Sequence, residues 1–355
     1  MSGVAAMEAE FATLRVADDA DGWALAAYRL AVARSELATR PEELEEALSL
    51  LQRAGRILTP DRAPLEHSRI LTAAASCHRA AGQPDQALEL FGQAAELALP
   101  RAPAPERAAA LVNVGLIQAE AGRPLEAITA LDTAVGLLET SGDDEGSRLL
   151  GAALINRAQA RQVLGDDPAL ADATSDYERA LEVLAPESPQ AGMAAHGLGA
   201  VLLERSRRDP ANNPVEPAIA AFERSLGTFG ASSHPLQHAI AKHSLALAYE
   251  QRGEAGDLVR AVSAVEASLA IFDPRLHQDQ WRTAAETLGR LERALDEAHG
   301  PRSRMAHTVS LMASTTADER RELLRERLRR VATQPLPRLE SELDSLTHAM
   351  CERPI

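Results

Sequence analysis

The apolar residues of this chain recur at spacings of four and three, which places them on one face of a helix. The stretch ALELFGQA, which starts at Ala87, has small residues at both ends and a large apolar residue, Phe91, at its fifth position. The same arrangement starts at each of six alanines: Ala47, Ala87, Ala127, Ala173, Ala218 and Ala261. Unrelated amphipathic helices would not keep this phase over six copies, so the pattern predicts an internal repeat.

A second helical segment is predicted upstream of each copy from the second onward. It carries a small residue twelve or more positions before the starting alanine, and in four of five copies a glycine follows seven residues later. These small residues are Ala75, Gly115, Ala158, Gly199 and Ala246. A further such segment, WRTAAETLGRL, starts at Trp281 and would be the first helix of a seventh pair. Each repeat is therefore expected to be a pair of helices, and the starting alanines are 40 to 46 residues apart.

The paired pattern resembles the tetratricopeptide repeat, in which a helix with Leu-Gly-x-x-Tyr precedes one with Ala-x3-Phe-x2-Ala. LALAY (residues 245–249) and AFERSL (residues 221–226) are close matches, and the resemblance covers roughly residues 22–300. The period is longer than the usual repeat of about 34 residues. The chain is similar to long-period bacterial arrays found beside caspase-like protease domains, although no protease domain is found in the sequence. The resemblance implies an all-α fold, a right-handed α-solenoid of about six to seven helix pairs.

Three regions are expected along the chain. Residues 1–20 are predicted to be a flexible acidic tail, residues 21–300 the solenoid, and residues 301–355 a C-terminal helical cap or extension. In the last region a capping box from Thr316 to Glu319 precedes one amphipathic segment, and a second follows the QPLP stretch. This region is interpreted as a cap on the open end of the solenoid. The alternative is that it folds into the groove or associates with a second subunit.

Composition limits the choice of partners and compartment. The net charge is −15, which disfavours nucleic acid as a partner because phosphates attract basic surfaces. Only two cysteines occur, Cys77 and Cys351, so neither a disulfide framework nor a zinc site is expected and a reducing cytoplasm fits best. We find no signal peptide and no apolar run long enough to cross a membrane, so no membrane association is expected.

No motif for catalysis or for a cofactor is present in the sequence. It contains no phosphate-binding loop, zinc-protease helix, nucleophile elbow or dinucleotide fingerprint, and no cofactor is predicted. His196 and His243 occupy equivalent positions in neighbouring repeats, three residues before the small residue. A metal site there lacks a third ligand, and proton transfer there lacks an identifiable substrate site. Polar contacts are therefore the favoured interpretation of these histidines.

The tetratricopeptide resemblance implies that residues three before, one after and four after each small residue line a concave groove. From these positions we select fourteen candidate partner-binding residues: Arg79, Val112, Leu116, Ile155, Gln159, Gln162, His196, Leu203, His243, Leu247, Glu250, Glu286, Arg290 and Arg293. The same rule also selects Thr72 and Ser76. The middle of this surface is mostly apolar or neutral, which suits an amphipathic helix or peptide of another protein.

The function hypothesis is a non-enzymatic adaptor or regulatory scaffold that binds another protein. Two alternatives stay open on the sequence: a regulator that senses a small peptide or metabolite in the groove, and an enzyme that uses the region of His196 and His243. The C-terminal helices of the chain itself, or a second copy in a homodimer, are further candidate occupants of the groove.

Overall fold

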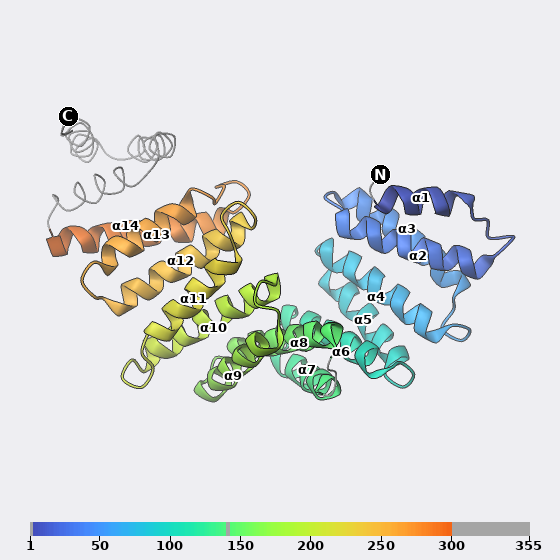
Figure 1. Ribbon diagram of the computed structural model, residues 1–355. Coiled ribbons are helices and arrows are strands. Elements are labelled where there is room, and N and C mark those ends of the chain that lie inside the picture. Colours follow the sequence, from blue (N-terminus) through green and yellow to red (C-terminus); the bar gives the residue numbers. More distant parts are fainter. Residues whose placement is uncertain (1–2, 140–142, 300–355) are drawn as a thin grey trace. The chain divides into compact units, whose positions relative to one another are not determined.

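A computed structural model describes residues 3–139 and 143–299 of the chain, and its described elements are all α-helices (Figure 1). In chain order they are α1 (Gly3–Thr13), α2 (Ala20–Leu37), α3 (Pro41–Ile57), α4 (Pro64–Ala80), α5 (Pro84–Ala98), α6 (Ala104–Glu120), α7 (Pro124–Leu138), α8 (Asp144–Leu164), α9 (Asp167–Val183), α10 (Pro189–Arg208), α11 (Glu216–Thr228), α12 (Pro235–Arg252), α13 (Asp257–Leu269) and α14 (Gln278–His299). The helices form pairs, and we call the even-numbered member from α2 onward the first helix of its pair and the odd-numbered member the second helix.

The described part of the chain divides into two compact units, a first unit that ends at Val201 and a second that begins at Leu202, so the boundary lies inside α10. In each unit the two helices of a pair pack closely, as α4 packs on α5, α6 on α7 and α12 on α13. Each pair also packs on the next, as α7 does on α8 and α13 on α14. The fold is therefore an all-α solenoid of stacked helix pairs, as the repeat pattern predicts.

The core of both units is built from the repeat positions that the sequence defines. All six starting alanines are completely buried, and the large apolar residues at the fifth position are at most 3% exposed. Those large residues are Leu51, Phe91, Leu131, Tyr177, Phe222 and Val265. The first helices contribute the small residues to this core, because two helices approach closely only where one of them has a small side chain or none. At Gly115, an added Cβ would lie 2.5 Å from Cγ of Leu131 on the partner helix α7.

Proline and glycine mark the helix ends in a regular way. Six described helices, among them α3, α5 and α12, begin with proline, whose missing N–H is no loss in the first turn of a helix. The four predicted turn glycines all have positive φ, from 68° to 73°, which other residues adopt only with strain. These glycines are Gly82, Gly122, Gly165 and Gly253. In the fifth copy the position is taken by Ser206, which lies within α10.

In both units, a histidine of a first helix forms a hydrogen bond with the end of the preceding helix pair. Nδ1 of His67, on α4, lies 2.7 Å from the carbonyl oxygen of Leu58, the C-cap residue of α3. His238, on α12, makes the equivalent contact at 2.8 Å with Phe229, the C-cap residue of α11. Each contact satisfies a carbonyl that the end of the preceding helix leaves without an intrahelical partner.

The first helices lie on the inside of the curve within each unit. Neighbouring first helices contact one another, α2 with α4, α6 with α8 and α12 with α14. Among the described helices of either unit, no comparable contact joins two second helices. Because the inner side of a curved stack is the shorter one, the first helices form the concave side of each unit.

The N-terminal region differs from its prediction. Residues 1–20 are expected to be a tail, but Gly3–Thr13 form helix α1, which packs on α2. The rings of Phe11 and Trp23 lie 5.3 Å apart, and Nη2 of Arg34 donates to Glu8 at 2.8 Å. The helix is missed because it buries none of its residues fully and has no clear apolar stripe. The predicted cap, residues 301–355, lies outside the described residues.

Candidate functional site

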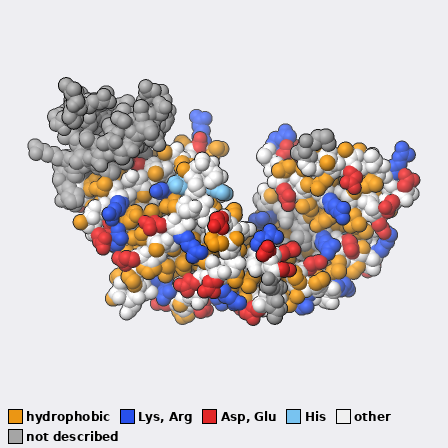
Figure 2. Space-filling view, in the orientation of Figure 1, with side chains coloured by type: hydrophobic (Ala, Val, Ile, Leu, Met, Phe, Trp, Pro, Cys, Tyr) orange, Lys and Arg blue, Asp and Glu red, His pale blue; other side chains and the backbone are white. Residues whose placement is uncertain are grey.

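A pocket of about 450 Å³ lies on the concave side of the first unit, between the first helices α2, α4 and α6. It is lined by Tyr28, Val32, Ser35, Glu36, Leu65, Ser68, Arg69, Thr72, Ala73, Ser76, Ala98, Glu106, Ala109, Ala110 and Asn113. On the visible face of this unit, hydrophobic side chains are interspersed with acidic and basic ones (Figure 2). The volume is in the range of pockets that hold small ligands or anchoring side chains.

The depth of the pocket comes from small residues. Ala73 on α4 and Ala109 and Ala110 on α6 stand where longer side chains would fill the space between the helices. Leu65 and Val32 add apolar surface at the two sides. The walls are therefore mainly apolar, and they are built from three different helices that the repeat packing holds in place.

Several hydroxyl groups of the pocket are already engaged with the helix backbone. The Thr72 hydroxyl donates to the carbonyl oxygen of Ser68 at 3.0 Å, and the Ser68 hydroxyl donates to that of Ala94 at 2.8 Å. By contrast, the side chains of Ser76 and Asn113 make no hydrogen bond to any residue that the structure describes. These two groups are available to a ligand.

The charges around the pocket are mostly paired across helices. Nη2 of Arg69 on α4 lies 2.8 and 2.9 Å from the two carboxylate oxygens of Glu106 on α6. Nη1 of Arg79 donates a single, longer hydrogen bond of 3.4 Å to Glu120 on α6. Burial raises the pKa of the Tyr28 hydroxyl, so this group is protonated at neutral pH and remains both donor and acceptor.

The candidate residues of the first unit are spread along the first helices. Val112 and Ile155 are buried in the core, whereas Arg79 and Gln159 are exposed. Leu116, Gln162 and His196 are half-buried. The side-chain amide oxygen of Gln162 accepts a hydrogen bond of 2.6 Å from the Tyr177 hydroxyl, which holds this side chain against the second helix α9. Of the positions selected by the groove rule, Thr72 and Ser76 line the pocket.

In the second unit, three candidate residues come together on α12 and α14. Arg290 donates two hydrogen bonds of 2.8 Å to the carboxylate of Glu250. Nε2 of His243 lies 3.2 Å from the hydroxyl oxygen of Thr287. Burial, and after it the Arg290 cation, lowers the pKa of His243, and burial lowers that of His196. These contacts join two first helices.

The remaining candidates of the second unit lie apart from that set. Leu203 is buried and Leu247 half-buried, while Glu286 and Arg293 are exposed on α14. His234 packs edge-on to Phe229 with ring centres 5.3 Å apart. In the first unit, Cys77 on α4 is buried, with 1% of its surface exposed, and burial raises the pKa of its thiol. The part of the chain that the structure describes contains no group of three side chains able to hold a metal ion.

Sequence reasoning misses the part of the pocket on α2. A signal for it exists, because Ala31 on α2 is a fully buried small residue before the first starting alanine. Positions three before, one after and four after Ala31 are Tyr28, Val32 and Ser35, and all three line the pocket. The spacing from Ala31 to Ala47 is sixteen residues, within the range of 12 to 19 residues of the later copies, but Ala38 stands where four of those copies have the turn glycine.

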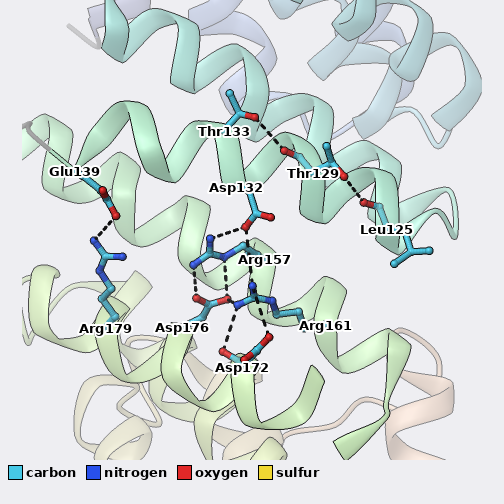
Figure 3. Close-up of polar contacts among 10 residues, drawn as sticks. All are labelled: Leu125, Thr129, Asp132, Thr133, Glu139, Arg157, Arg161, Asp172, Asp176 and Arg179. Atoms are coloured by element: carbon cyan, nitrogen blue, oxygen red, sulfur yellow. Dashed lines mark hydrogen bonds and ion pairs between the residues drawn. The ribbon is translucent and has the colours of Figure 1, made fainter. Parts of the chain in front are cut away.

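A compact ionic cluster on α7, α8 and α9 is also absent from the predictions (Figure 3). Arg157 on α8 donates to both carboxylate oxygens of Asp176 on α9, at 3.0 and 2.5 Å, and to Asp132 on α7 at 2.7 Å. Arg161 donates to Asp176 at 2.6 Å. The Asp176 side chain is only 4% exposed, so its charge is held by the two guanidinium groups.

The fold and the repeated core positions define a protein of stacked tetratricopeptide-like helix pairs. Residues 66–140, which span α4 to α7, match the family model of the tetratricopeptide repeat. This part of the chain consists of tetratricopeptide repeats, as the sequence pattern predicts. The likeness to arrays beside caspase-like proteases stays a prediction.

Solved structures of repeat proteins share the fold at low sequence identity. BtubC (BKLC) from P. vanneervenii matches with a TM-score of 0.51 and 18% identity, over 65% of this chain and 89% of that one. A Rap protein complexed with competence and sporulation factor matches with a TM-score of 0.50 and 14% identity, over 83% and 80%. The assembly chaperone of RpL4 matches with a TM-score of 0.50 and 15% identity, over 75% and 98%.

A search of curated proteins gives no match to the sequence. Within the described residues, no helix has both the length and the apolar character needed to cross a membrane.

Proposed function

We propose that this protein is a non-enzymatic interaction module, an adaptor or regulatory scaffold, that binds a segment of another protein on the concave side of its first unit. The observation that carries the proposal is the pocket between α2, α4 and α6, whose walls are mainly apolar and whose volume is about 450 Å³. Its alanines leave room for an anchoring side chain, and Ser76 and Asn113 offer hydrogen bonds to a bound main chain.

Two further features support a binding role over catalysis. His243, the residue in the region considered for chemistry, is hydrogen bonded to the Thr287 hydroxyl between two packed helices. The charged groups beside it, Arg290 and Glu250, neutralise each other. The Rap protein, which is similar in fold, was solved in complex with competence and sporulation factor, and this supports a binding role. We place the protein in the bacterial cytoplasm on the same proposal.

The proposal is tested by filling the pocket. Ala109→Leu adds bulk inside it, and Ala171→Leu adds the same bulk at an exposed position of the second helix α9. Proteins captured from the native host by the wild-type chain are quantified by mass spectrometry against both variants, with folding checked by circular dichroism. We expect at least one partner to be lost from Ala109→Leu and retained by Ala171→Leu.

Equal capture by all three proteins would contradict the proposal. A thermal-shift screen distinguishes the metabolite-sensing alternative, because a small ligand of the pocket raises the melting temperature of the wild type and of Ala171→Leu only.

A further inference from the structure

Glu36 is the one lining residue of the pocket whose charge has no counter-ion within the described part of the chain. The only other charged lining residues are Arg69 and Glu106, and they neutralise each other. Glu36 is exposed and lies in the last turn of α2. The carbonyl groups at the C-terminal end of a helix carry partial negative charge, so this carboxylate stands at a position that favours a cation.

The apolar walls lead to this carboxylate. Glu36 follows Val32 by four residues on α2, so the two side chains lie on one helix face, one turn apart. The pocket next to Glu36 is lined by the apolar side chains of Val32, Ala73 and Ala109. Lysine and arginine have this combination of properties, because a long apolar stem carries a charged head that remains near water.

Building on the proposed function, we infer that the pocket recognises a basic side chain of the partner, whose stem lies between α2, α4 and α6 and whose charged head meets the Glu36 carboxylate. Asn113 supplies an amide oxygen as a further acceptor on the opposite helix. The partner segment is accordingly expected to present arginine or lysine at its anchoring position, with an uncharged isostere binding more weakly.

The inference is tested on the full chain labelled with 3-fluorotyrosine. The protein has three tyrosines, and the ¹⁹F resonance of Tyr28, assigned with Tyr28→Phe, reports on the pocket. Four capped pentapeptides of alanine with a central arginine, lysine, citrulline or norleucine serve as probes. We expect the arginine and lysine peptides to shift the Tyr28 resonance at concentrations about three- to tenfold lower than the two neutral peptides, as for a partly exposed charge pair.

The matched variants are Glu36→Gln and Glu96→Gln. Both remove one negative charge from the first unit, but Glu96 lies exposed on α5 outside the pocket. We expect Glu36→Gln to reduce binding of the arginine peptide to the level of the citrulline peptide, and Glu96→Gln to leave it unchanged.

Three results would overturn the inference: no shift of Tyr28 by any peptide, equal titration by arginine and citrulline peptides, or the same loss from both variants. Failure here is distinguishable from failure of the proposed function. A pocket that takes norleucine as well as arginine, with partner capture still lost in Ala109→Leu, keeps the binding role and removes only its preference for a basic side chain.

Discussion

At the scale of single residues, close helix packing depends on missing side chains. Gly115 on α6 faces Leu131 on α7, and a Cβ at Gly115 would overlap that side chain. Gly136 on α7 is exposed and has open space around its Cα. The two glycines are therefore in helices for different reasons, although the sequence shows the same residue.

We predict opposite effects of alanine at these two positions. Gly115→Ala is expected to lower the free energy of unfolding by about 1–3 kcal/mol, because the core is overpacked. Gly136→Ala is expected to raise it by about 0.5–1 kcal/mol, because alanine loses less backbone entropy in a helix. Urea unfolding followed by circular dichroism measures both, and a stabilised Gly115→Ala would show that the helices do not approach as described.

His196 and His243, both half-buried, give the folding stability of the chain a pH dependence with a definite sign. In the folded state burial lowers the pKa of His196 and of His243 from the ordinary value of 6.5. The unfolded chain then binds more protons than the folded chain below about pH 6.5, so stability is full above that pH and falls as the pH drops through the lowered values.

We expect the melting temperature of the wild type to fall between pH 7.5 and pH 5, and to fall less in His243→Gln and in His196→Gln. Scanning calorimetry at several pH values measures the slopes. Identical slopes for the wild type and both variants would mean that neither histidine is neutral and buried in the folded chain.

At the scale of elements, the repeat register explains the ionic cluster of α8 and α9. The position of Arg157, one before the small residue, is apolar in neighbouring copies, as at Leu198 and Leu245. Asp176 stands three residues after its starting alanine, and this position is apolar in the other copies, as at Leu50. An ion pair thus replaces an apolar contact between two helices in this one repeat.

The presence of an ion pair at positions that are apolar in other repeats predicts how variants change the free energy of unfolding. Asp176→Leu alone is expected to cost about 3 kcal/mol, because it removes the main partner of Arg157 and Arg161. The double variant Arg157→Leu with Asp176→Leu is expected to recover most of that loss, since a well-packed apolar pair often equals a buried ion pair. Asp132→Asn, at a residue whose side chain is half exposed, is the control and is expected to cost less than 1 kcal/mol. Failure of the double variant to recover would contradict the shared register.

The sequence predicts the elements well because burial in a repeat depends on local spacing. Ala87, Phe91 and Ala94 recur as a unit, and a single helix face suffices to explain them. Two features of the structure cannot be predicted from local spacing. Helix α1 has no apolar stripe, and the contact of Arg157 with Asp176 joins residues on different helices whose charges look like solvent-exposed side chains in the sequence.

The candidate site is predicted only in part. The groove rule finds Thr72 and Ser76, which line the pocket, and with Ala31 as a reference it also gives Tyr28 and Val32. It does not find Ala73, because the depth of a pocket depends on where three helices leave space, and this is a property of the packed helices. The other candidate residues stay predictions.

At the scale of the whole molecule, the acidic charge is not distributed evenly over the helices. The second helices α5 and α7 contain acidic residues and no arginine or lysine. The concave side carries paired charges instead, such as Arg69 with Glu106 and Arg79 with Glu120. A net charge of −15 attracts basic partners over a distance, while the side chains of the pocket determine which partner segment binds.

Binding of a partner segment on the concave side of the first unit can be measured by site-specific photocrosslinking in the native host. A photoreactive phenylalanine analogue is placed at Ser76, which lines the pocket, or at Ala171, which is exposed on the second helix α9. We expect a crosslinked partner from position 76 only, and we expect it to be lost when Ala109→Leu is added. Crosslinking to the same partner from position 171 and not from position 76 would contradict binding on the concave side.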